Sequence, residues 1–280
     1  MIAATLAASA VVVATPTFAY AAPVDPAAAL AKQYIAGHGV KVSETATLTM
    51  DGKKADLPSK LTGVVEFGKY GVIASDLTRR VKPDAATKKI IASNEEGMEG
   101  LAAMYRPTRY LTVKGITYVK GGLPYSSLPD GKKWLSLEDA EVPMPGSGQP
   151  IDIFDKKVMK TLLKSATSVK GGLYSGSISV KSLWQTSPKG NLDPKLGKVK
   201  IQYRIQLDGR QLVSRVTSKL VLDYGLLGKI ASTVDTRFYD WGVKVSIVAP
   251  PADEVATAED FAEEPTIEVP DLLNLDASRD

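Results

Sequence analysis

The sequence predicts an α+β fold built on one large, mainly antiparallel β-sheet with few helices. Three observations lead to this class: stretches in which apolar and polar residues alternate, short glycine-containing turns between them, and only a few helical segments. Short turns join antiparallel neighbours, whereas parallel strands need long crossover connections. A chain of 280 residues, of which 44% are hydrophobic and 24% charged, can bury the core of such a fold.

The first expected helix occupies residues 24–37. Asp25 can cap it, Pro26 suits the first helical position, and Gly37 can end it. Residues 83–105 contain helix-forming residues interrupted by glycines, so their structure stays open at this point.

The second expected helix covers residues 151–166, after a loop at 141–150 that contains three prolines and two glycines. The side chains on one stripe of this helix are mainly apolar, and lysines lie opposite. The stripe consists of Ile151, Phe154, Val158, Leu162 and Ser165.

Strands are expected wherever apolar residues recur at every second position. The strongest case is Val199–Leu207, which alternates strictly before an Asp208-Gly209 hairpin turn. Ile178, Val180 and Trp184 are likewise expected on one face of a strand. Further strands are expected within residues 43–50, 61–81, 109–122, 134–137, 215–225 and 235–249, with the Pro250-Pro251 pair ending the sheet.

The first 21 residues have the layout of a secretory signal peptide. An apolar run at residues 2–13 is followed by Pro16 and by Ala19-Tyr20-Ala21, which predicts cleavage after Ala21. The run is shorter than the roughly 20 residues of a membrane span. Because no Lys or Arg precedes it, a buried N-terminal helix is the alternative. We therefore expect a protein that is secreted or exposed on the exterior of the cell envelope and, without a cysteine after the cut, not lipid-anchored.

The charges are unevenly distributed along the chain. Residues 252–280 hold ten acidic residues and one Arg, so the totals of 35 basic and 31 acidic residues leave 34 and 21 before them, a net charge of +13. A basic body could contact an anionic envelope surface, or its charge could serve solubility alone. The basic residues form no dense cluster, so no nucleic-acid partner is expected. The expected organisation is a signal peptide at 1–21, one domain at 22–251 and an acidic, flexible tail at 252–280; the oligomeric state stays open.

The sequence contains no recognisable catalytic, cofactor or metal-binding pattern. Without cysteine, no disulfide, thiol nucleophile or thiolate metal ligand can form. The single histidine, His38, lies between glycines and is expected at the end of the first helix. Nucleophile-elbow, phosphate-loop and dinucleotide fingerprints are absent. We therefore expect no enzyme and no cofactor; a hydrolase would need two carboxylates that converge in a cleft.

The stretch Asp235–Val255 resembles the C-terminal signature of actinobacterial LolA-like cell-envelope lipoproteins of the LppX/LprG type, T-R-[YF]-x-D-W-G followed by V-x-[IV]-x-A-P-P. The Asp130–Trp134 segment resembles the "DGKKW" sequence that precedes a strand in that family. The likeness spans roughly residues 25–256, although the anchoring cysteine is missing and the middle reads "GGLYSGSISV" where many relatives carry a glycine-threonine-histidine-tyrosine patch. The matching signature positions are Thr236, Arg237, Phe238, Asp240, Trp241, Gly242, Val245, Ile247, Ala249, Pro250 and Pro251.

In this C-terminal stretch we expect structural roles rather than chemistry. It should form a strand, a turn and a second strand, with Asp235 and Asp240 as turn-forming residues. Arg237 and Trp241 should fix the penultimate strand against the edge of the sheet.

The resemblance implies a strongly curved half-barrel sheet with helices covering its concave side. It also implies a cavity between sheet and helices that holds an acyl lipid or another hydrophobic ligand. We therefore expect a non-enzymatic carrier or chaperone; the alternative is a structural or interaction module of the envelope with the same fold and a filled core. The expected ligand-lining residues are Phe154, Val158, Leu162, Ile178, Val180, Trp184, Val199, Ile201, Tyr203 and Ile205.

Overall fold

The computed structural model of the chain describes residues 25–51, 53–54, 58–93, 99–122, 128–137, 144–188, 192–225, 228–257 and 260. The predicted signal peptide and residues 258–259 and 261–280 of the predicted tail lie outside these residues, so both remain predictions.

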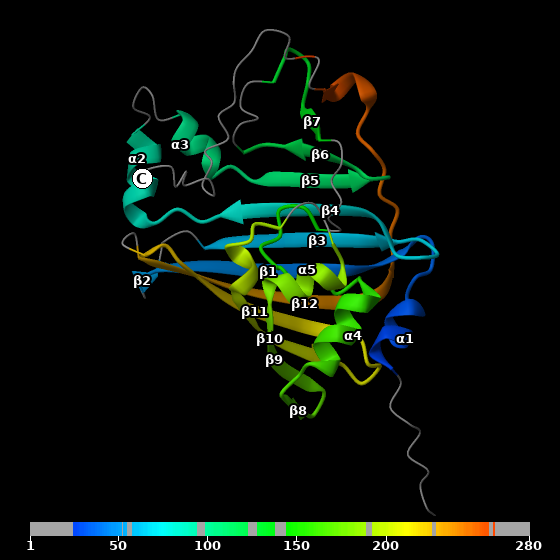
Figure 1. Ribbon diagram of the computed structural model, residues 1–280. Helices are drawn as coiled ribbons and strands as arrows, with labels where there is room; N and C mark the ends of the chain where they lie inside the picture. Colours follow the sequence, from blue (N-terminus) through cyan, green and yellow to red (C-terminus); the bar gives the residue numbers. More distant parts are fainter. Residues whose placement is uncertain are drawn as a thin grey trace, which may run out of the picture.

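One sheet organises the described chain (Figure 1). Its strands are β1 His38–Met50, β2 Lys53–Lys54, β3 Ser59–Phe67, β4 Val72–Val81, β5 Thr108–Val113, β6 Ile116–Lys120, β7 Trp134–Leu137, β8 Ser168–Lys170, β9 Leu173–Ser179, β10 Lys200–Leu207, β11 Val213–Asp223, β12 Lys229–Lys244 and β13 Val255–Ala256. Their order is β13-β7-β6-β5-β4-β3-β1-β12-β11-β10-β9-β8, with β2 paired to β1. Neighbours among the described strands are antiparallel except β13 and β7, which run parallel.

The sheet curves, and its helices lie over one half of it. Figure 1 shows α4 and α5 in front of β9–β12, with α1 beside α4, while α2 and α3 lie together beyond the ends of β4 and β5. The predicted class, a strongly curved and mainly antiparallel sheet with helices on the concave side, is confirmed. The helices are α1 Pro26–Ala31, α2 Ala85–Ser93, α3 Glu99–Met104, α4 Lys156–Lys164 and α5 Val180–Thr186, with 3₁₀ turns η1 Leu196–Lys198 and η3 Ala252–Glu254.

Two predicted helices are shorter than expected, α1 at its C-terminal end and α4 mainly at its N-terminal end. Asp25 caps α1 as predicted, accepting the Ala27 N–H at 3.0 Å, but α1 ends at Ala31 rather than near Gly37. Asp155 caps α4, accepting the Lys157 N–H at 2.7 Å, so the helix begins at Lys156 and not at Ile151. The start of the predicted apolar stripe therefore lies on an irregular loop.

The prediction that Ile178, Val180 and Trp184 share a strand face is wrong. Strand β9 ends at Ser179, whose side chain accepts the Ser182 N–H at 3.0 Å and caps α5. Only Ile178 belongs to β9, while Val180 and Trp184 lie on α5. A hydroxyl cap at this position starts a helix despite the alternating residues before it.

The predicted turn near Asp240 is wrong, because β12 continues through it as one strand with a bulge. Asp240 has φ +53° and Gly242 has φ +87°, and the register of β12 against β1 shifts between Gly39 and Lys41. Asp235 lies within the strand and pairs with Arg215 at 2.5 Å, so it forms no turn.

Pro250-Pro251 also does not end the sheet. The chain leaves β12 after Lys244, and residues 245–250 form no strand. After the two prolines, β13 pairs with β7, and the Lys133 N–H donates to the Glu254 carbonyl at 2.8 Å. Residues up to Ala256 therefore belong to the sheet, beyond the expected boundary of the domain at Pro251.

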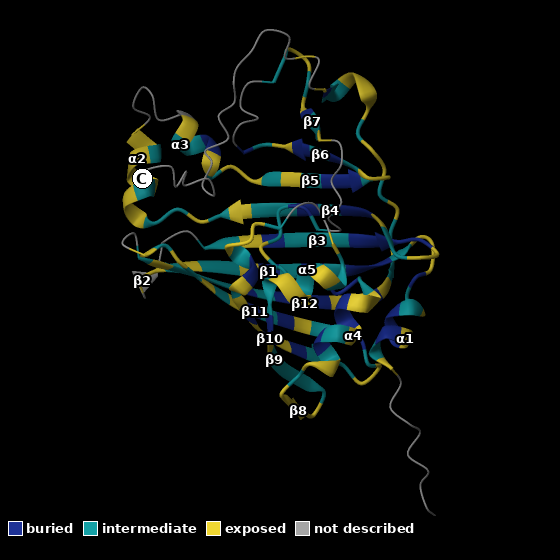
Figure 2. Cartoon of the chain, in the orientation of Figure 1, coloured by how far each residue is buried: buried dark blue, intermediate teal, exposed yellow. Residues whose placement is uncertain are grey.

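An aromatic cluster fills the core where α1, the loop before α4 and the sheet meet. Phe67 and Trp241 stack with ring centroids 5.9 Å apart, and Tyr34, Phe154 and Phe238 pack around this pair. The Trp241 indole N–H donates to the Val213 carbonyl at 3.0 Å, so the buried ring leaves no donor unpaired. This geometry supports a structural role for Trp241, whereas Arg237 is exposed. Figure 2 shows the buried residues gathered along the strands and on α1.

We expect Phe67→Ala to lower the free energy of unfolding by about 4 kcal/mol, because Phe67 is fully buried at the centre of this cluster. Urea denaturation monitored by circular dichroism measures the change. Tyr70→Ala is the matched control, since Tyr70 is 82% exposed and its loss should cost less than about 0.5 kcal/mol. Equal effects of the two substitutions would contradict the assigned core.

Candidate hydrophobic binding pocket

Residues 144–155, which lie between β7 and α4 in the sequence, form a loop that runs across the concave face of the sheet. This loop is here called the crossing loop. Gly146 allows its close approach to the sheet, and Gly148 lies beside β1. A Cβ on Gly146, whose φ is +77°, would overlap the Tyr110 ring on β5. A Cβ on Gly148 would lie 3.5 Å from the Ala46 side chain on β1. The loop therefore touches both halves of the sheet.

A buried carboxylate holds the crossing loop on the sheet. Glu44, on the inner face of β1 and 2% exposed, accepts hydrogen bonds from the Ser147 hydroxyl at 2.5 Å and the Gly148 N–H at 2.8 Å. The Thr236 hydroxyl on β12 donates to the same carboxylate at 3.0 Å. The Gln149 side-chain amide then donates to Thr236 at 3.2 Å. Three donors around one buried carboxylate fix the position of the loop.

The far end of the crossing loop is held by Tyr34, which lies between α1 and β1. The Tyr34 hydroxyl donates to the Phe154 carbonyl at 2.7 Å, and the Asp152 carboxylate accepts the Phe154 N–H at 2.9 Å. Burial, and then the charges of Asp152 and Asp155, raise the pKa of Tyr34 well above its usual value. The phenol therefore stays protonated and keeps donating to the loop.

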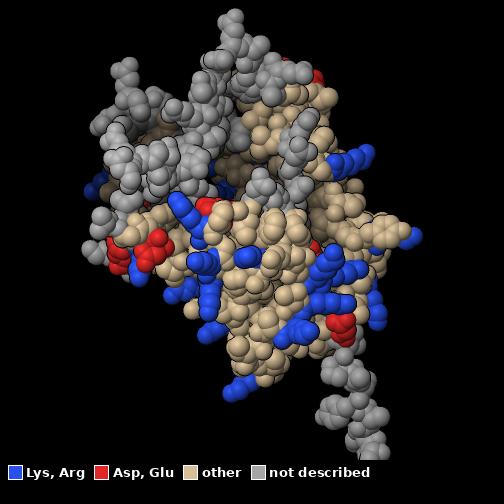
Figure 3. Space-filling model, in the orientation of Figure 1, with Lys and Arg blue, Asp and Glu red and all other residues tan. Residues whose placement is uncertain are grey.

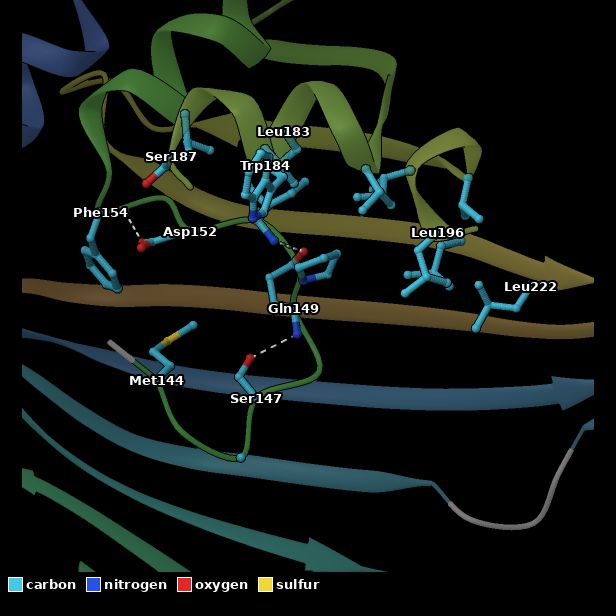
Figure 4. Close-up of a pocket in the computed structure, with 18 residues that line it drawn as sticks. Met144, Ser147, Gln149, Asp152, Phe154, Leu183, Trp184, Ser187, Leu196 and Leu222 are labelled. Atoms are coloured by element: carbon cyan, nitrogen blue, oxygen red, sulfur yellow. Dashed lines mark hydrogen bonds between the residues drawn. The ribbon is translucent and has the colours of Figure 1, made fainter. Parts of the chain in front are cut away.

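Between the crossing loop, α5, η1 and the inner faces of β10 and β11 lies a pocket of about 520 Å³ (Figure 4). Figure 4 shows Leu183 and Trp184 of α5 on one side, Leu196 and Leu222 toward one end, and Phe154 toward the other. This volume lies within the range of small-molecule sites, about 300–1,000 Å³. The lining residues are Met144, Gly146, Ser147, Gln149, Pro150, Ile151, Asp152, Phe154, Val158, Val180, Leu183, Trp184, Ser187, Leu196, Val199, Ile201, Leu220 and Leu222.

The pocket brings together six of the ten residues predicted to line a ligand site: Phe154, Val158, Val180, Trp184, Val199 and Ile201. The other four, Leu162, Ile178, Tyr203 and Ile205, are buried in the packed core beside it. Tyr203 shows why, since its hydroxyl donates to the Leu162 carbonyl at 2.7 Å and closes the space between β10 and α4.

Sequence reasoning missed most of the crossing loop, together with Leu183, Leu196, Leu220 and Leu222. For Leu220 and Leu222 the signal is weak, because Val221 between them is also apolar and interrupts the alternation seen in β10. Apolar residues do not recur at a regular spacing in the loop, so the sequence gives no indication of which loop side chains face inward. Their place depends on Glu44, which is far away in the sequence.

The lining offers apolar contact and a few polar groups. Its hydroxyl, amide and carboxyl side chains belong to Ser147, Gln149, Asp152 and Ser187, and it contains no Lys, Arg or His. Within the described residues, no group of three or more His, Cys, Asp or Glu could hold a metal ion. His38 is half-buried at the start of β1, not at the end of α1 as predicted. In the described part of the chain, no helix is both long and apolar enough to cross a bilayer.

The other half of the concave face mixes buried apolar side chains, such as Leu77 and Val119, with polar groups. Two atoms on β4, Ser75 Oγ and Arg79 Nε, are buried without a hydrogen-bond partner. On β5 and β6 the hydroxyls of Thr112 and Thr117 pair at 2.8 Å. The apolar lining therefore belongs to the half of the sheet that α4 and α5 cover.

Comparison with known proteins gives only distant likenesses. No protein-family model matches the chain, and comparison with curated proteins finds no match. A hypothetical protein from Chlamydia trachomatis is 11% identical, with 81% of this chain and 98% of that chain covered and a TM-score of 0.29. A DUF1329 family protein from Desulfovibrio piger is 11% identical, with 80% of this chain and 92% of that chain covered and a TM-score of 0.33. A LolA superfamily protein from Nitrosomonas europaea is 8% identical, with 79% of this chain and 93% of that chain covered and a TM-score of 0.30. Likeness at this level transfers no function, so the pocket is judged by its own residues.

We expect Glu44→Gln to loosen the crossing loop and to lower the free energy of unfolding by about 2 kcal/mol. The amide nitrogen would be a donor where three donors already converge. Hydrogen exchange of the Gly148 amide should accelerate, and denaturation measures the free energy. As a control, Asp240→Asn removes an exposed carboxylate paired with Lys41 and should change stability by less than about 1 kcal/mol. Unchanged exchange at Gly148 in Glu44→Gln would show that the carboxylate does not hold the loop.

Proposed function

We propose that this chain is a non-enzymatic binding protein that carries an acyl lipid or another hydrophobic ligand. The observation that carries the proposal is the pocket of about 520 Å³, whose walls are mainly aliphatic and aromatic side chains. Burying a methylene group contributes roughly 0.8 kcal/mol. About ten methylenes therefore contribute roughly 8 kcal/mol, which exceeds the lower estimates of the cost of association, about 4 kcal/mol.

The pocket favours this role over that of a structural module with a filled core. The core beside the pocket is closely packed, with Leu162 and Ile205 fully buried. Close packing is the norm for protein interiors. A hollow lined by Leu183, Leu196 and Leu222 next to such a core is therefore a specific feature that a ligand could fill.

We further propose that the protein acts outside the cytoplasm, in contact with the anionic envelope. The signal-peptide layout of residues 1–21 supports secretion. Figure 3 shows Lys and Arg side chains spread over the face that carries α4 and α5. Helix α4 carries the exposed Lys156, Lys157, Lys160 and Lys164. A positive face of this kind supports electrostatic attraction to anionic lipids or wall polymers.

A charge placed in the pocket tests the carrier proposal. We expect Leu183→Asp to weaken binding of a fluorescent fatty acid at least tenfold, because the new carboxylate would lose its hydration against apolar walls. Fluorescence titration of the purified protein measures the affinity. Gln185→Asp, at an exposed position of the same helix, is the control and should bind like the unmodified chain.

Native mass spectrometry of protein purified from a secreting host gives an independent test. We expect a co-purifying lipid that Leu183→Asp fails to retain. If the unmodified chain neither retains a lipid nor binds the fluorescent fatty acid, the carrier proposal is wrong.

A further inference from the structure

The convex face of the sheet, opposite the helices, gathers basic side chains that lie far apart in the sequence. On β11 the exposed Arg215 and Lys219 flank Thr217, and the residues that alternate with these three point inward and are buried. Arg204 of β10 lies directly opposite Thr217, and Arg237 of β12 lies directly opposite Arg215. Directly opposed residues of neighbouring strands project from the same face of a sheet. These four exposed cations, Arg204, Arg215, Lys219 and Arg237, are here called the basic cluster.

The basic cluster holds more positive charge than the described residues neutralise. Asp235 faces the cluster, because it lies directly opposite Thr217. Its two carboxylate oxygens accept hydrogen bonds from the Arg215 guanidinium at 2.8 and 2.5 Å, so this pair is complete. Carboxylates toward the ends of these strands pair with other basic residues. In the part of the chain that the structure describes, the other three cations of the cluster therefore have no ion pair.

The opposition of Arg237 and Arg215 works against the stability of the sheet. Like charges directly opposite each other on neighbouring strands are destabilising. The exposed Arg237 side chain makes no hydrogen bond to any described residue, so nothing in that part of the chain offsets this repulsion. A cation that weakens the sheet without a contact of its own points to a partner outside the chain.

A row of directly opposed residues carries the positive charge further across the convex face. From Arg204 the row leads through β11, β12 and β1 to Lys60 of β3 and Arg80 of β4, which are exposed and also face each other. Strands lie about 4.8 Å apart, so the five steps of this row span about 24 Å. Between Arg204 and Lys60 the row contains Thr217, Asp235 and Thr45. The row therefore offers charges and hydroxyl groups but no apolar side chain.

A linear polyanion fits this row better than a bilayer does. A flexible polymer can follow a convex surface along its whole length, whereas a flat bilayer meets such a surface only at its crest. Proteins that rest on a bilayer place apolar and aromatic side chains in its interface beside their basic residues, and this row supplies none. Three of the four cations in the cluster are Arg, whose guanidinium group binds the paired oxygens of phosphate or carboxylate.

We infer that the convex face docks a linear anionic polymer, whose phosphate or carboxylate groups pair with the basic cluster and with Lys60 and Arg80. This inference rests on the proposed contact with an anionic envelope, and it names the surface and the partner. The polymer and the pocket occupy opposite faces of the sheet, so the inference does not depend on a ligand in the pocket.

Isothermal titration at low ionic strength tests the inference with three probes. Poly(glycerol phosphate) carries phosphodiester groups, polyglutamate carries carboxylates, and phosphatidylglycerol vesicles present phosphates on a bilayer. We expect at least one polymer to bind more tightly than the vesicles at equal negative charge. The double substitution Arg204→Gln/Arg237→Gln should weaken polymer binding about tenfold, because it removes two cations that have no partner in the described chain. Added salt should weaken the same binding by screening.

Lys160→Gln/Lys164→Gln is the matched control, since it removes the same charge from exposed positions of α4 on the concave side. It should change polymer binding less than about twofold. The arginine double variant should keep its affinity for a fluorescent fatty acid. Its urea midpoint should be no lower than that of the unmodified chain, because one repulsive pair is removed.

Equal weakening by the two double variants would show that only net charge matters, and the inference would be overturned. It is also overturned if neither polymer binds, even where the vesicles do. The same holds if only a peptide of residues 261–280, with its six carboxylate side chains, binds the cluster. A fatty acid that fails to bind contradicts the carrier function but leaves the polymer result standing, so the two failures are distinguishable.

Discussion

The buried carboxylate of Glu44 determines how the concave side of this sheet is used. It lies near the middle of the sheet, where β1 joins the two halves, and its three donors come from the crossing loop and from β12. An ionised or polar group at such a place is costly unless it is hydrogen-bonded. By using the Ser147 hydroxyl and the Gly148 N–H, Glu44 draws an otherwise irregular segment onto the sheet. The wall of the pocket is thus built from a loop that has little regular structure of its own.

A packed core and the pocket lie side by side beneath the helices that cover the sheet. At one end, Phe67, Phe154, Phe238 and Trp241 fill the space between α1, the crossing loop and the strands. At the other end, α5 rests on the sheet mainly through aliphatic side chains, and these leave the pocket open. The clustered rings fill their end of this space, and one of them, Phe154, also borders the pocket together with Trp184 of α5.

Much of the fold follows from local patterns in the sequence. The alternation in Val199–Leu207 predicts β10, with the residues that alternate inward buried, because a period of two matches the pleat of a strand with one buried face. The curved shape and the helices on the concave side came from the family resemblance rather than from periodicity. Local patterns failed where one side chain decided between two structures. Ser179 starts a helix where alternation suggested a strand, and positive φ angles at Asp240 and Gly242 make a bulge where a turn was expected.

The pocket could be predicted only in part, for a related physical reason. In helices and strands the spacing of apolar residues indicates which positions face inward. Val158, Val199 and Ile201 could therefore be identified from the sequence. Whether an inward residue lines the pocket or, like Leu162 and Ile205, lies in the packed core depends on how far the helices lie from the sheet. The spacing of residues in the sequence does not contain that distance. The loop positions, such as Ser147 and Gln149, depend on contacts with β1 and β12 across about a hundred residues of chain.

The parallel pairing of β13 with β7 ties the last described strand to an edge of the sheet. Lys133 reaches it with a backbone N–H to the Glu254 carbonyl, and Lys132 with its ammonium group to the Val255 carbonyl at 2.8 Å. A free edge offers its backbone groups to any neighbouring chain. The short segment after the two prolines thus covers this edge and protects it from edge-to-edge aggregation. A protein shortened at Pro251 would lose this protection.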